Sequence, residues 1–231
     1  VPGIFAMTGV LALIAIGVIK FVTPDPGKAA FHSDAEANPA RLGDVFRNGE
    51  LLRLNWGIFA LHAAQMAMFV VVPFALVQSG NLDAEHHWQV YLPVLLISLV
   101  LMVPAIIHGE KGGRMKPVFV AAVALMLGAQ LLLAVTMQHF WGVVVALLFY
   151  FIAFNTLEAS LPSLVSKIAP PEAKGTAMGV YNTAQAFGLF FGGFVGGWLA
   201  QHYGFSAVFA FCAVLMAIWL WLAAGMAPPP R

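Results

Sequence analysis

Charged side chains are scarce in this sequence. Only 9% of its 231 residues are Asp, Glu, Lys or Arg, whereas 61% are hydrophobic. A soluble domain usually carries about 25% charged residues, so the composition places the chain in a lipid bilayer. The formal net charge is +1 and no basic stripe is present. This argues against a nucleic-acid partner, because nothing would neutralise the phosphates.

Cysteine is rare in the sequence, and the common catalytic motifs are missing. The single cysteine, Cys212, cannot form an internal disulfide and lies in an apolar run, so we interpret it as a packing residue. The sequence contains no HExxH zinc motif, no GxSxG nucleophile elbow and no GxxxxGK(S/T) phosphate loop. We therefore expect a protein that is not an enzyme, uses no metal or other cofactor and is not driven by ATP.

Long apolar runs make up most of the sequence. Seven of them are long enough to cross a bilayer. They lack the period-2 alternation of barrel strands, so they favour helices. The runs are residues 1–21, 54–77, 88–107, 117–137, 141–164, 176–200 and 207–226. The sequence thus predicts an all-α membrane protein with seven transmembrane helices.

These runs define the expected organisation of the chain. We expect a first helix (1–22), a linker (23–53), a six-helix bundle (54–227) and a short tail (228–231). In the linker, residues 39–52 place apolar side chains near one helical face, which is typical of an amphipathic helix at a membrane surface. A mostly disordered tether fits the linker equally well. The chain starts VPGIF inside an apolar run and without Met, so we expect that an upstream part is missing.

The basic residues predict how the helices are oriented. When the helices are threaded through a membrane in order, every Lys and Arg falls on one side. These residues are Lys20, Lys28, Arg41, Arg47, Arg53, Lys111, Arg114, Lys116, Lys167, Lys174 and Arg231. Because positively charged loops stay in the cytoplasm, we predict that the linker and the C-terminus are cytoplasmic.

Five polar residues lie deep inside the apolar runs. At a rise of about 1.5 Å per residue, they lie roughly 13–18 Å from the nearest basic residue at the predicted cytoplasmic end. They are His62, Gln65, Asn155, Glu158 and Gln185. An ionisable side chain at membrane depth is costly and usually faces a protein interior or a watery cavity. We therefore expect this layer to line a substrate or proton pathway, with Glu158 neutral in one conformation and charged in another.

Other interpretations of the same residues remain open. The five could act only as structural polar contacts that satisfy one another between helices. His62 and Glu158 could be the acid and base of a membrane-embedded enzyme. The chain could also be a non-transporting sensor or assembly module.

The turn after the third run carries a resemblance to a known family. Its sequence, HGEKGGRMKP, resembles the signature loop of the major facilitator superfamily, although Ile106 stands in place of the leading glycine and Met115 is an extra residue before the last base. The stretches AFNTLEASLPSLVSKIAP and KGTAMGVYNTAQAFGLFFGGFVGGWLA resemble the carboxyl-terminal half of its drug–proton antiporter branch. The residues that match the loop are Glu110, Lys111, Gly113, Arg114 and Lys116.

The resemblance implies a fold and an activity. The first run would be the sixth helix of the family fold and the other six would be helices seven to twelve. Two six-helix bundles would rock around a midplane cavity as substrate and protons bind, and the amino-terminal bundle would be the missing partner. The activity implied is proton-coupled efflux of small, partly apolar molecules across the inner membrane. The signature loop would stabilise one gate state, with Glu110 near the amino end of a helix in the opposite bundle.

Glycines are expected to pack the sixth of the seven runs closely. Small residues spaced four apart let helix backbones approach one another in a membrane. The glycines assigned to this role are Gly188, Gly192, Gly193, Gly196 and Gly197.

Overall fold

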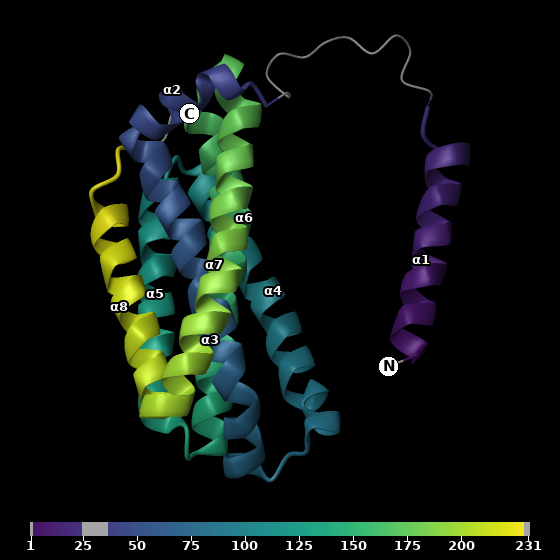
Figure 1. Cartoon of the computed structure of the whole chain (residues 1–231), viewed down its shortest axis with the longest axis vertical. Coiled ribbons are helices and arrows are strands. Elements are labelled where there is room, and N and C mark those ends of the chain that lie inside the picture. Colours follow the sequence, from purple (N-terminus) through teal and green to yellow (C-terminus); the bar gives the residue numbers. More distant parts are fainter. Residues whose placement is uncertain (1, 25–36, 229–231) are drawn as a thin grey trace. The chain divides into compact units, whose positions relative to one another are not determined.

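The computed structural model describes residues 2–24 and 37–228. It divides into two compact units, Val1–Ser33 and Asp34–Arg231. The first unit contains the helix α1 (Pro2–Phe21), and the second contains all the other helices (Figure 1). Residues 25–36 of the predicted linker lie outside the described residues, as do Lys28 and Arg231.

Each of the seven predicted apolar runs lies within a helix apart from at most two residues at an end, and the described residues contain no strand. The prediction of an all-α membrane protein is therefore confirmed. After α1, the long helices are α3 (Gly49–Gly80), α4 (Trp88–Lys111), α5 (Met115–Thr136), α6 (Phe140–Ile168), α7 (Lys174–Tyr203) and α8 (Phe205–Ala224). Short helical segments precede α3, α4 and α7; they are η1 (Pro39–Arg41), α2 (Leu42–Arg47), η2 (Ala84–His86) and η3 (Pro171–Ala173).

Five helical segments among the described residues are long and apolar enough, by length and composition, to cross a membrane. They are Gly49–Gly80, Ala84–Lys111, Met115–Thr136, Phe140–Ile168 and Phe205–Ala224. Helix α7 has 30 residues, but its glycines and its polar residues near Gln185 make it less apolar. In α1, the apolar stretch found is the shorter Phe5–Phe21.

The first helix of the bundle starts earlier than its apolar run. Asn48 is extended (φ −84°, ψ 103°), and its side chain accepts hydrogen bonds from the backbone N–H groups of Glu50 and Leu51. This is an N-cap, which satisfies donors that have no partner inside the helix. Helix α3 therefore begins at Gly49 rather than at residue 54, and the stretch 39–52 is divided between η1, α2 and α3.

One end of the bundle gathers the basic residues, and we call it the basic end. Here α3 begins, α4 ends and α5 begins, α6 ends and α7 begins, and α8 ends (Figure 1). Its Lys and Arg residues on these helices and turns are Arg53, Lys111, Arg114, Lys116, Lys167 and Lys174. Arg53 also ties two helices together, because its Nη1 lies 2.6 Å from Glu50 Oε1 and 2.6 Å from the Gly225 carbonyl after α8.

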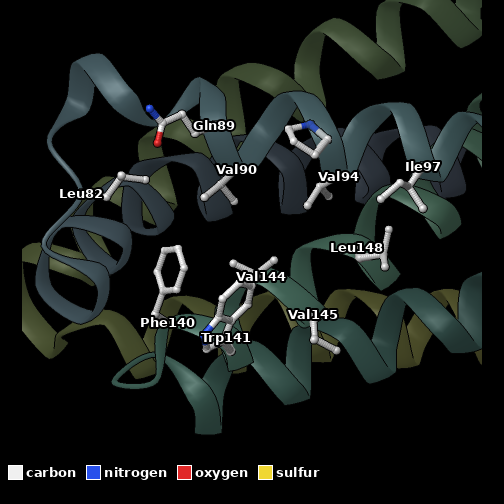
Figure 2. A pocket seen from close by; sticks show the side chains of 11 residues that line it. Leu82, Gln89, Val90, Val94, Ile97, Phe140, Trp141, Val144, Val145 and Leu148 are labelled. Carbon is white, nitrogen blue, oxygen red and sulfur yellow. The ribbon is translucent and has the colours of Figure 1, made fainter.

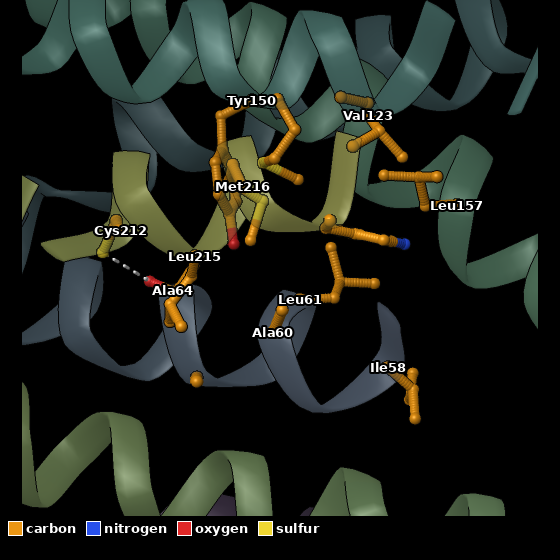
Figure 3. Packing of buried hydrophobic residues seen from close by; sticks show 14 of the residues in the cluster. Ile58, Ala60, Leu61, Ala64, Val123, Tyr150, Leu157, Cys212, Leu215 and Met216 are labelled. Carbon is orange, nitrogen blue, oxygen red and sulfur yellow. Dashed lines mark hydrogen bonds between the residues drawn. The ribbon is translucent and has the colours of Figure 1, made fainter. Parts of the chain in front are cut away.

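The core of the bundle is a continuous apolar cluster. Figure 3 shows side chains from α3, α5, α6 and α8 meeting there, among them Leu61, Val123, Leu157 and Met216. Cys212 is fully buried in this cluster, and its Sγ lies 3.8 Å from the Ala64 carbonyl oxygen. The free thiol therefore fills space between α8 and α3 (Figure 3).

Candidate functional site

Three of the five deep polar residues meet in the bundle. His62 comes from α3, Glu158 from α6 and Gln185 from α7. Gln185 Nε2 lies 2.8 Å from His62 Nε2 and 3.5 Å from Glu158 Oε1. His62 Nε2 and Glu158 Oε2 are 3.8 Å apart. One amide thus bridges an imidazole and a carboxylate, and the cluster joins three helices.

The contacts of His62 define its tautomer. Its Nδ1 lies 3.2 Å from the Ile58 carbonyl oxygen, which can only accept, so Nδ1 carries the hydrogen. In the neutral ring Nε2 is then an acceptor, and it receives an N–H of Gln185. The His62 side chain is 6% exposed, so this arrangement satisfies both ring nitrogens in a place that water barely reaches.

Glu158 is the open member of the cluster. Its side chain is 37% exposed, although its Oε2 is buried and has no hydrogen-bond partner among the described residues. The contact from Gln185 to Oε1 is long, at 3.5 Å. The carboxyl group therefore has unused capacity to bind a proton or a donor.

Close packing of α7 on α3 accompanies this contact. A Cβ at Gly188 would overlap the Phe59 carbonyl oxygen, and one at Gly192 would overlap that of Ala63. One at Gly196 would lie 2.6 Å from Ala67 Cα. Since these residues recur every four positions on both helices, the two backbones run together along one seam. Gln185 lies one turn before Gly188, so the polar contact is at the edge of the seam.

The other two glycines assigned to packing are placed differently. A Cβ at Gly193 would meet only the end of Met66, at 4.0 Å, and one at Gly197 would meet nothing within 4 Å. They lie off the seam.

Asn155 and Gln65 do not join the cluster. Asn155 Nδ2 donates to Ser98 Oγ at 2.8 Å, and Ser98 in turn donates to the Leu95 carbonyl at 2.7 Å. Asn155 therefore ties α6 to α4. Gln65 is half-buried one turn beyond His62, and no hydrogen bond of its side chain is found among the described residues.

Sequence reasoning missed Ser98 and the rings around His62. Ser98 is a polar residue in the middle of the apolar run of α4, between Leu92 and Ile107, a signal that could have been used. Phe154 packs edge-on against His62 at 5.8 Å between ring centroids, and Tyr150 stacks on Phe154 at 5.8 Å. Nothing in the sequence distinguishes these rings from other aromatic core residues.

A cavity of about 320 Å³ separates α4 from α6 beyond the Ser98–Asn155 hydrogen bond. Figure 2 shows Val90, Val94 and Ile97 of α4 on one side of it and Trp141 and Val145 of α6 on the other. Its lining is apolar apart from Gln89. The cluster of His62, Glu158 and Gln185 does not line this cavity.

The signature-like loop is a tight turn between α4 and α5. Gly113 has a positive φ of 61°, the left-handed conformation that glycine adopts without strain. The N–H of Gly113 donates to the Glu110 carbonyl at 3.3 Å, and that of Arg114 to the Gly109 carbonyl at 2.8 Å. This pair of bonds is a Schellman motif, so Gly113 has a local reason to be glycine.

The charges of this loop make contacts at the basic end. Glu110 Oε1 lies 3.6 Å from Lys167 Nζ in the last turn of α6. Arg114 Nη1 lies 3.5 Å from His108 Nε2. Lys111 is exposed and Lys116 is half-buried. The ion pair is exposed enough to contribute only about 0–1 kcal/mol, and it joins the loop to the helix that carries Glu158.

Comparison with known proteins decides the family. The family model of the Major Facilitator Superfamily matches residues 1–193 and, separately, residues 109–231. The chain belongs to the major facilitator superfamily. The inner membrane transport protein YajR of Escherichia coli K12 is 39% identical over 227 residues, which is 98% of this chain and 50% of YajR.

Two more distant relatives fit the same superfamily assignment. An uncharacterised transporter of Buchnera aphidicola from Acyrthosiphon pisum is 26% identical over 82% of this chain and 48% of its own length. The multi-drug resistance efflux pump PmrA of Streptococcus pneumoniae is 28% identical over 75% of this chain and 43% of its own length. The chain thus spans about half the length of the curated relatives it matches.

Proposed function

We propose that this chain is part of a secondary active transporter that moves small, partly apolar molecules by alternating access, in exchange for protons. The superfamily membership and the names of the relatives, the inner membrane transport protein YajR and the multi-drug resistance efflux pump PmrA, support transport and efflux. The observation that carries the proton coupling is the cluster of His62, Gln185 and Glu158, in which one amide bridges two titratable groups on different helices.

Protonation would change the contacts between these helices. With His62 neutral, Nε2 accepts from Gln185. A proton on Nε2 makes it a donor, so the N–H of Gln185 must turn away, and the charged ring can then pair with the Gln185 amide oxygen or with the Glu158 carboxylate 3.8 Å distant. A proton therefore favours one arrangement of α3, α6 and α7 over another, which is what coupling requires.

The other predicted pathway residues receive separate roles. We assign Asn155 to holding α4 on α6 through Ser98. Gln65, one turn from His62 and without a hydrogen-bond partner among the described residues, would line the substrate or proton pathway.

The signature-like loop completes the proposal. Glu110, Lys111, Gly113, Arg114 and Lys116 would form the gate element at the basic end. By the positive-inside rule that end faces the cytoplasm, so the linker and the C-terminus would be cytoplasmic and the protein would lie in the inner membrane.

Proton-driven transport by the full-length protein in liposomes tests this proposal. The probe is tetraphenylphosphonium, a lipophilic cation, whose movement is followed with an imposed pH gradient. We expect Glu158→Gln to lower pH-driven transport about tenfold or more, the ordinary range of coupling between sites. Glu172→Gln is the matched control, since Glu172 is an exposed carboxylate in η3. Equal transport by Glu158→Gln and the unmodified protein would contradict the proposal.

A further inference from the structure

A second site lies at the basic end and does not include the side chains of the polar cluster. An open cleft of about 710 Å³ is lined by the linker, the first turns of α3 and the first half of α7. The linker contributes Leu42 and Phe46, α3 contributes Leu52 and Asn55, and α7 contributes the stretch up to Phe187. This volume falls within the range of about 300–1,000 Å³ typical of small-molecule sites.

The linker wall of the cleft is held in place. The backbone N–H of Asn38 donates to Thr176 Oγ1 at 2.8 Å, and the Thr176 hydroxyl donates to the Asn38 carbonyl at 3.0 Å. On α2, Val45 is fully buried. The cleft is therefore formed before a ligand arrives, which lowers the entropy that binding costs.

The lining has a definite chemistry. None of the described residues that line the cleft is charged, so among them a charged ligand would lose its hydration without gaining a counter-ion. Phe46 and Phe187 expose 55% and 56% of their surface and offer rings for stacking.

Asn55 supplies the polar group. It is 9% exposed, and its Nδ2 is buried without a hydrogen-bond partner among the described residues. A buried amide N–H without a partner is unfavourable. Rotation of the amide about the Cβ–Cγ bond, which exchanges its nitrogen and oxygen, would present that donor to a ligand in the cleft.

We propose that this cleft binds an uncharged aromatic small molecule that carries a hydrogen-bond acceptor for Asn55. Asn55 lies seven residues before His62 on α3, two turns or about 10 Å away on the same face. The cleft reaches Ala184 and Phe187, on either side of Gln185 in α7, but none of the three side chains of the polar cluster lines it. The binding proposal does not depend on transport.

Photolabelling with benzophenone tests the proposal. Benzophenone is uncharged, has two aromatic rings and one carbonyl acceptor, and couples to nearby C–H bonds when irradiated. The full-length protein in lipid nanodiscs is labelled at increasing probe concentrations, and mass spectrometry locates the label. We expect saturable labelling of peptides that cover residues 37–46, 52–55 and 176–187. Labelling that rises linearly with concentration and is spread over all helices would overturn the proposal.

Variants separate the acceptor contact from general apolar binding. We expect Asn55→Leu to raise the half-saturating concentration about fivefold to tenfold, because the donor is lost. Thr183→Val is the matched control, since the Thr183 hydroxyl lines the same cleft but already donates to the Gly179 carbonyl at 2.9 Å. Equal effects of the two substitutions, or no effect of either one, would overturn the role of Asn55.

Two further measurements test the proposed ligand class if Asn55→Leu does not fold. Phe46→Ala removes an exposed ring and is expected to raise the half-saturating concentration severalfold. A benzophenone that bears a trimethylammonium group is expected to label the cleft at least about fivefold less than benzophenone itself, because the lining provides no counter-ion. Unchanged labelling by Phe46→Ala, or equal labelling by the charged probe, would overturn the proposed ligand class.

Discussion

Helices α7 and α4 contact the rest of the bundle in opposite ways. Along α7, Gly188, Gly192 and Gly196 bring its backbone against that of α3. In α4, few residues are buried: only 17% of the apolar stretch within Ala84–Lys111 that is long enough to span a membrane. A cavity of about 320 Å³ lies between α4 and α6. Within the residues described here, the contact of α7 with α3 is therefore packed more closely than the contact of α4 with α6.

The position of the polar groups follows this contrast. The contact of Gln185 with His62 is at the edge of the seam, where the helix backbones are fixed relative to one another. The Ser98–Asn155 bond instead joins α4 to α6 across a looser contact. A proton-dependent change at the Gln185–His62 contact would be transmitted through close-packed backbones. A change at the Ser98–Asn155 bond would instead act on the looser contact between α4 and α6.

A side chain placed between α3 and α7 should have the largest effect on stability. Gly192→Leu forces atoms into the backbone of Ala63 and should cost about 3 kcal/mol, the upper end of the usual cost of overpacking. Thermal unfolding of the purified protein in detergent measures this loss. Gly197→Leu is the control, because a Cβ there meets nothing within 4 Å. Equal losses in the two variants would mean that the seam is not tightly packed.

Removing the bridge at the edge of the seam should have the next largest effect. Gln185→Leu leaves His62 Nε2 without its donor at a side chain that is 6% exposed, which should cost about 1–2 kcal/mol of unfolding free energy. The same unfolding measurement applies. Gln201→Leu on the exposed end of the same helix should change stability little. A comparable loss there would show that the Gln185–His62 contact contributes no particular stability.

The single hydrogen bond between α4 and α6 should matter less. Ser98→Ala removes the acceptor of Asn155 and should lower the unfolding free energy by about 1 kcal/mol or less, as for other polar contacts between membrane helices. Ser79→Ala, which removes only a bond within α3, is the control. If Ser98→Ala were as damaging as Gly192→Leu, α4 would be held far more firmly than its packing indicates.

Filling the cavity should have the smallest effect. Val94→Leu adds a methylene to a side chain that lines the cavity between α4 and α6, so stability should change by no more than about 0.5 kcal/mol. Val143→Leu adds the same group at a fully buried position of α6 outside the cavity lining and should cost about 1–2 kcal/mol. We therefore expect the unfolding temperature of Val143→Leu to lie below that of Val94→Leu, and equal temperatures would contradict looser packing between α4 and α6.

The sequence was sufficient to locate the helices. Apolar runs and their flanking polar residues predicted every long helix, because in a membrane the length of a run and its charges leave few alternatives. The start of α3 was missed because Asn48 caps the helix ahead of its apolar run. A cap is a local hydrogen bond that hydropathy does not detect.

The candidate site was only partly predictable. Counting residues from the basic end gives the depth of His62, Asn155, Glu158 and Gln185, but not the direction in which each side chain points. Asn155 turned out to face Ser98 on α4, although it lies one turn from Glu158. Likewise, spacing alone did not distinguish Gly192, which lies in the seam, from Gly193 and Gly197 beside it. Such directions depend on how the helices pack, which is a property of the whole bundle.

The most direct test of the central claim asks whether His62 and Glu158 act as one proton-exchanging unit. Proton-driven transport in liposomes is measured for His62→Gln, for Glu158→Gln and for the double variant. Residues that work as a unit give strongly non-additive losses. We predict that the double variant is no worse than the more damaging single variant. If the two losses simply multiply, the residues act independently and the cluster is not the coupling site.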